Sequence, residues 1–105
     1  MRIDIKPLSV NKAWMGKRFK TKEYKKFEND LLYLLPKIDT TDFSDLEITY
    51  GFSSKLADID NPTKMVLDVM QKRYGFNDRD IIKLTLRKAL VNKGNEYIDI
   101  KINKK

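Results

Sequence analysis

The chain has 105 residues, and its 22 basic and 15 acidic side chains give a formal net charge of +7. It contains neither cysteine nor histidine, which excludes a disulfide scaffold, thiolate or imidazole metal sites, and the common catalytic triads. The remaining chemistry is that of carboxylates, lysines, hydroxyls, or a hard metal ion bound by oxygen. The positive charge favours a polyanionic partner, although it also suits a merely soluble basic surface.

The length and composition predict a single domain over residues 1–105, because chains divide into several cores only well above this size. No apolar stretch approaches the roughly 20 residues of a membrane span, and the N-terminus lacks a signal-peptide core. We therefore expect a cytoplasmic protein without a membrane partner.

The first third of the chain predicts a strand, a loop and a helix. In "MRIDIK" at 1–6, Ile3 and Ile5 alternate with charged residues, a pattern typical of a half-buried strand. Residues 8–20 show no period and predict a long loop. Thr21 is a plausible N-cap for a helix of about 14 residues that ends at a proline. Its apolar face comprises Tyr24, Phe27, Leu31 and Leu34 or Leu35.

The remainder predicts a strand, a helix and two further strands. Apolar residues alternate with small or polar ones in 46–53, indicating the second strand. Asn61 as N-cap, Pro62 at the first helical position and Gly75 as C-cap bound the second helix. Alternating apolar residues predict the last two strands, on either side of a turn at 92–95; they are Ile82, Leu84, Leu86, Ile98, Ile100 and Ile102. The class is α+β, a mixed four-stranded sheet with two helices packed on it in the order β-α-β-α-β-β.

Two aspartates follow the second strand in "ADIDNPTK" at 57–64. At a strand end, Asp58 and Asp60 point to one face, where two carboxylates repel each other unless a proton or a cation lies between them. Lys64 falls on the first turn of the next helix, and Asp78 precedes the third strand. If the helix is a crossover, three carboxylates and a lysine converge in a set of oxygen ligands that suits Mg²⁺ or Mn²⁺.

A plainer interpretation of the same residues stays open. Asp58 and Asp60 can form a helix-capping turn, with Asp78 an ordinary loop residue. An EF-hand does not fit, because Pro62 and Thr63 occupy the positions where the calcium loop needs a ligand and a glycine.

The stretch "DIDNPTK…VLDVMQKRYGFNDRDIIKL" resembles the RusA family of Holliday junction resolvases, common in phages and prophages. That family carries D-x-D-N, a lysine three residues on, a helix, and a short acidic link into a strand. The segment "PLSVNKAWMGKRFKTKEYKKF" is also similar to the family's opening, where S-x-N follows the first strand and a basic loop leads to the first helix. The similarity runs from about Arg2 to Lys101.

The resemblance implies a Mg²⁺-dependent endodeoxyribonuclease that makes paired symmetric cuts in four-way DNA junctions during recombination and repair, with Mn²⁺ as a possible substitute. The implied metal ligands are Asp58, Asp60 and Asp78, with Lys64 stabilising charge on the phosphate or positioning the water. Paired cuts imply a homodimer with one site per subunit. Since the family often has two adjacent acids where this chain has "NDRD", Asp80 is the alternative to Asp78.

DNA contacts are expected from the basic loop and from the edge of the acidic turn. Residues 11–26 carry a formal charge of +6, which suits phosphate neutralisation. Some family members have arginines before the acidic pair, whereas this chain has only Lys55 in "SSKLA". The expected DNA-binding residues are Asn11, Lys12, Lys17, Arg18, Lys20 and Lys55. The competing interpretation is a catalytically silent nucleic-acid-binding protein that uses the same basic face.

Overall fold

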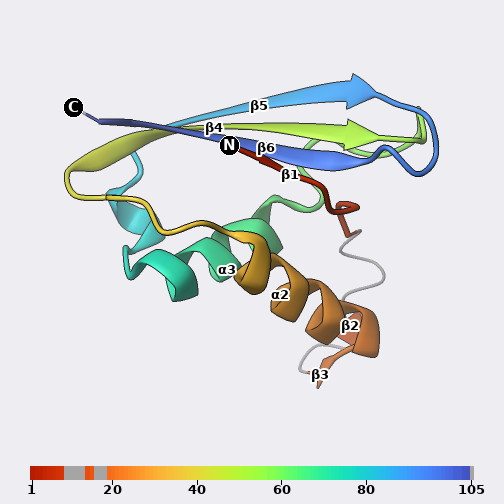
Figure 1. The fold of residues 1–105 in the computed structure, drawn as a ribbon, viewed down its shortest axis with the longest axis horizontal. Helices are drawn as coiled ribbons and strands as arrows, with labels where there is room; N and C mark the ends of the chain where they lie inside the picture. The colour runs from red at the N-terminus through yellow and green to blue at the C-terminus, as the bar shows by residue number, and fades with distance from the viewer. Residues whose placement is uncertain (9–13, 16–18, 105) are drawn as a thin grey trace.

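A computed structural model describes residues 1–8, 14–15 and 19–104 of the chain (Figure 1). Two helices lie on one side of a four-stranded sheet, so the expected α+β class and element order are confirmed. The helices are α2 (Lys22–Leu34) and α3 (Thr63–Tyr74), and a 3₁₀ turn, η1 (Asp78–Asp80), follows α3. The strands of the sheet are β1 (Arg2–Ile3), β4 (Phe43–Phe52), β5 (Lys83–Leu90) and β6 (Tyr97–Lys104).

The sheet is mixed and has the strand order β1-β6-β4-β5. β4 and β5 run parallel with α3 as the crossover between them, while β6 is antiparallel to both β4 and β1. Paired residues share a face. Leu84, Leu86, Lys88 and Leu90 of β5 therefore lie on the same face as their buried partners in β4, which are Leu46, Ile48, Tyr50 and Phe52. β5 forms one edge of the sheet.

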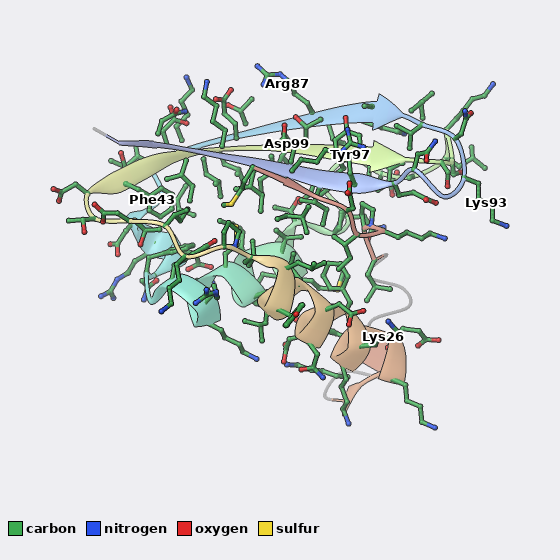
Figure 2. The ribbon with its side chains drawn as sticks, in the orientation of Figure 1. Lys26, Phe43, Arg87, Lys93, Tyr97 and Asp99 are labelled. Carbon is green, nitrogen blue, oxygen red and sulfur yellow. The ribbon has the colours of Figure 1, made fainter. Side chains whose placement is uncertain are left out.

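The core lies between the sheet and the two helices. Tyr24, Phe27 and Leu31 of α2, at the helical spacing expected from the sequence, pack into it. α3 contributes Met65, Val66, Val69 and Met70. The opposite face of the sheet is polar: Glu47 accepts from Arg87 and Asn103, and Arg87 points away from the helices (Figure 2). One face of the sheet is therefore buried and the other is solvated.

The capping residues predicted from the sequence were confirmed at two helix ends and wrong at a third. Thr21 caps α2, since its Oγ1 accepts from the N–H of Tyr24 at 3.1 Å. Gly75 ends α3 with a φ of 76°, a left-handed conformation that favours glycine. Asn61 was wrong as the N-cap of α3: the helix begins one residue later than expected, at Thr63, with Pro62 at the cap and no side-chain cap bond.

The structure also differs from the sequence-based prediction in the first half of the chain. Within the predicted loop 8–20, two short strands, β2 (Trp14–Met15) and β3 (Phe19–Lys20), pair antiparallel. Strands of two residues are too short to show an alternating pattern, which explains why they were missed. β4 begins at Phe43, where a register shift against β6 interrupts the alternation. Neither helix of the described ranges is long and apolar enough to cross a membrane.

Candidate functional site

The acidic turn, defined as residues 58–61, is the last part of the segment that connects β4 to α3. It is made of successive tight turns: the N–H of Asn61 donates to the carbonyl of Asp58 at 3.2 Å, and that of Thr63 donates to Asp60 at 3.1 Å. The side-chain carboxylates of Asp58 and Asp60 are both exposed. Within the described part of the chain, neither carboxylate has an ion-pair partner. The turn thus presents two uncompensated negative charges to solvent.

A buried hydrogen bond fixes the beginning of α3, immediately after the acidic turn. The hydroxyls of Tyr50 and Thr63 are 2.9 Å apart, and both residues are buried. Burial raises the pKa of the Tyr50 hydroxyl far above its ordinary value, because charging it would require desolvation. Tyr50 therefore remains a neutral phenol that ties β4 to the first turn of α3.

Lys88 holds the chain immediately before the acidic turn. From the helix side of β5, its ammonium donates to the carbonyls of Lys55 and Ala57, at 2.8 and 2.5 Å. The N–H of Ala57 donates to the carbonyl of Ser54 at 3.3 Å, which closes a turn in the same segment. Lys88 was not among the residues expected from the sequence, since its partners lie more than thirty positions away.

Lys64 contacts a different set of acids from the one expected. Its Nζ lies 3.1 Å from Oδ1 of Asp68, one turn along α3, and 3.5 Å from Oδ2 of Asp78. The N–H of Asp78 donates to the side chain of Gln71 at 3.1 Å, which keeps Asp78 against α3. The hydrogen bond with Asp68, more than any other contact, raises the pKa of Lys64. Lys64 is therefore a cation and a poor general base.

The structure brings Lys64 and Asp78 together but does not gather Asp58, Asp60 and Asp78. Because β4 and β5 are parallel, the chain leaves β4 at one end of the sheet and enters β5 at the other. Between them α3 spans about 18 Å, at about 1.5 Å a residue. No group of three acidic side chains close enough to hold a metal ion occurs in the described residues. Asp80, the alternative third acid, is exposed in η1.

The two exposed carboxylates nevertheless match the donor chemistry of magnesium. Mg²⁺ prefers oxygen ligands, keeps several of its waters, and is often bound through one or two carboxylates together with phosphates of a substrate. Asp58 and Asp60 have free carboxylate oxygens within the described ranges and lie two residues apart in one turn. The residues that fit a magnesium ion are therefore this pair of aspartates.

Asp58 also lines a cleft of about 770 Å³ between the segment after β1, α2 and the segment after β4. Five acidic side chains and two lysines contribute to its described wall, while apolar residues such as Phe27, Phe52 and Pro62 line the remainder. The acids are Asp4, Glu23, Asp30, Asp58 and Glu96, and the lysines are Lys6 and Lys26. The cleft is thus acidic in a chain whose net charge is positive.

Of the six expected DNA-binding residues, two lie in the described structure. Lys55 is exposed beside the acidic turn. Lys20 is half-buried, with its Nζ 3.0 Å from Oε2 of Glu28. The hydrogen bond that Lys20 donates to Glu28 raises the pKa of Lys20, so this lysine stays charged and its charge is compensated within the protein. The others, Asn11, Lys12, Lys17 and Arg18, lie outside the described residues.

The chain was compared with models of known protein families and with curated proteins, and neither comparison found a match.

Proposed function

We propose that this protein is a magnesium-dependent endodeoxyribonuclease that cuts four-way DNA junctions in recombination and repair, acting in the cytoplasm as a homodimer. The observation that carries the proposal is the acidic turn: two exposed carboxylates, two residues apart, held by Lys88 on one side and by the Tyr50–Thr63 hydrogen bond on the other. The similarity of the D-x-D-N-x-x-K pattern to RusA resolvases supplies the substrate class.

Charge distribution supports a catalytic role for the turn. A protein that only binds nucleic acid gains nothing from uncompensated carboxylates beside a phosphate backbone, since they weaken binding. Asp58 and Asp60 are both exposed, and Lys55 lies just before them. If DNA lies along this surface, the two carboxylates would repel its phosphates. A metal cation bound between carboxylates and phosphate would remove this repulsion.

In this proposal Asp58 and Asp60 hold Mg²⁺, with Mn²⁺ as an alternative. Held by these two carboxylates, Mg²⁺ would supply Lewis-acid chemistry at the scissile phosphate and would lower the pKa of water there toward neutral pH. Lys64, kept protonated mainly by its bond to Asp68, stabilises negative charge on the phosphate. Asp78, 3.5 Å from Lys64, orients that ammonium. Lys88 fixes the carbonyls of the preceding segment, which limits the movement of Asp58.

The decisive experiment is cleavage of a synthetic four-way junction with Mg²⁺ by the wild-type chain and by Asp60→Asn. We expect paired symmetric cuts from the wild type and a loss of at least about 100-fold in rate for the variant, with junction binding kept or improved because a negative charge has been removed. Asp45→Asn, the same change on the opposite face of the sheet, serves as the matched control and should cut normally.

If Asp60→Asn loses junction binding as well as cleavage, the acidic turn has a structural role and the metal-site proposal is refuted. Comparing Asp78→Asn with Asp80→Asn identifies the acid that assists. A linear duplex and an RNA junction of the same sequence test the substrate class.

The second candidate is a catalytically silent nucleic-acid-binding protein. The observation that favours it is the ion network of Lys64 with Asp68 and Asp78, in which the lysine is already paired with acids of the protein itself. Under this alternative the wild-type chain binds four-way junctions but makes no cuts in either Mg²⁺ or Mn²⁺.

A further inference from the structure

The free edge of the sheet exposes large apolar side chains. β5 pairs with β4 on one side and, among the described elements, with nothing on the other. On the helix side of this strand, Leu84 is 41% exposed and Leu90 is 59% exposed, and Ile82 just before it is 78% exposed. An exposed apolar edge is a template for pairing with another strand.

The exposed residues form two groups along the strand. Ile82 and Leu84 lie at its beginning, and Leu90 lies at its end, where the segment held by Lys88 carries Leu56, which is 91% exposed. Leu86 lies between the groups and is only partly exposed. An antiparallel copy of the same strand would set the first group of one chain against the second group of the other.

Charge and apolar pairing together select one register for such a pair. Opposite residues of antiparallel strands share a face, and like charges directly opposite each other are destabilising. A pairing centred on Arg87 opposes two copies of Arg87, and a pairing centred on Thr85 opposes Lys83 to Arg87. A pairing centred on Leu84 opposes Leu90 to Asp78, outside the strand. Centred on Leu86, the pairing opposes Arg87 to Thr85, Lys83 to Ala89 and Leu84 to Lys88. The same register also opposes Ile82 to Leu90.

We propose that β5 is a homodimer interface at which two copies of this chain pair antiparallel about a two-fold axis through Leu86, joining their sheets into one. The self-complementary edge makes the contact isologous, as a C₂ dimer requires. Both helix layers then lie on the same face of the joined sheet. This inference locates the partner of the proposed nuclease, but its evidence and its test are independent of cleavage.

The first test is the mass of the chain in solution, measured by sedimentation across a range of concentrations. We expect twice the mass of the chain for the wild type, and a dissociation constant raised by about 10-fold or more in Ile82→Lys, because a charge is placed against Leu90 of the second copy. Tyr33→Lys, which alters an 89% exposed side chain of α2 away from β5, should leave the mass unchanged. A monomeric wild type, or a dimer indifferent to Ile82→Lys, would overturn the proposal.

The second test determines the register by disulfide formation. Since the chain has no cysteine, only the introduced residue can form the crosslink. In Leu86→Cys the two sulfurs come from directly opposite residues, about 4.5–5.5 Å apart at Cα, within reach of a disulfide. In Arg87→Cys they come from diagonal positions, about 7–8 Å apart, beyond that reach. We expect crosslinking in the first variant alone; crosslinking in the second alone would refute the register.

Discussion

Thr63 connects the core to the acidic turn through one hydroxyl. Its bond to Tyr50 is buried at both ends, so removing one partner leaves the other without a hydrogen bond in the interior. Thr63→Val should therefore lower the free energy of unfolding by about 1–3 kcal/mol. Urea denaturation measures this change.

The matched control for Thr63→Val is the double variant Tyr50→Phe/Thr63→Val. Replacing both partners by apolar groups of similar shape is nearly neutral, so the double variant should recover most of the stability lost in the single one. Additive losses would show that the two hydroxyls are not coupled.

At the candidate site, the sequence allows prediction of contacts only between residues that are close to one another in the chain. The pairing of Lys64 with Asp68 follows the spacing of four residues that brings helical side chains together, and it could have been expected from that rule. Lys88 could not, because its contact with the carbonyls of Lys55 and Ala57 exists only once β5 lies beside β4. The separation of Asp58 from Asp78 likewise follows from the parallel crossover.

Among the secondary-structure elements, α2 joins two parts of the molecule through Glu28. This carboxylate accepts from Lys20 of β3 and from Lys72 of α3, each at 3.0 Å. Burial disfavours its charge, but the two hydrogen bonds outweigh that effect and hold the pKa of Glu28 below its ordinary 4.5. Since the pKa is lower in the folded state, the stabilisation is present above about pH 4.5 and is lost as pH falls through the folded value.

Glu28→Gln tests this pH dependence. We expect the wild type to exceed the variant in unfolding free energy by about 1 kcal/mol at neutral pH, and the difference to shrink as the pH is lowered below about 4.5 and Glu28 becomes protonated. Urea denaturation at neutral and at acidic pH measures it. A difference that persists in acid would assign the effect to packing.

The elements themselves were largely predictable because their hydrophobic periods are long. α2, α3 and the alternating residues of β4 and β6 each bury one face, and burial imposes the period that the sequence displays. The hairpin of β2 and β3 has no such period. The N-cap of α3 differed because the N–H of Thr63 bonds the carbonyl of Asp60, so backbone turns replace the side-chain cap.

At the scale of the whole molecule, the proposed dimer determines where the two acidic turns lie. Each turn follows the carboxyl end of its own β4, on the helix side of the sheet. Antiparallel pairing of β5 reverses one sheet relative to the other, so the turns come to opposite ends of the joined sheet while facing the same way. A four-way junction also has approximate two-fold symmetry. Its two scissile strands could therefore reach the two acidic turns on one face of the dimer.

The proposed DNA binding leads to a prediction of which cations neutralise phosphates. Each lysine or arginine that neutralises a phosphate steepens the plot of log affinity against log salt by about 0.9. Lys20 already pairs with Glu28, whereas Lys17 and Arg18 belong to the basic segment of the sequence, outside the described residues. Junction binding by Lys17→Ala/Arg18→Ala, measured by fluorescence anisotropy, should show a slope shallower by about 1.8. Lys20→Ala should leave the slope nearly unchanged, and the reverse result would move the DNA path onto β3.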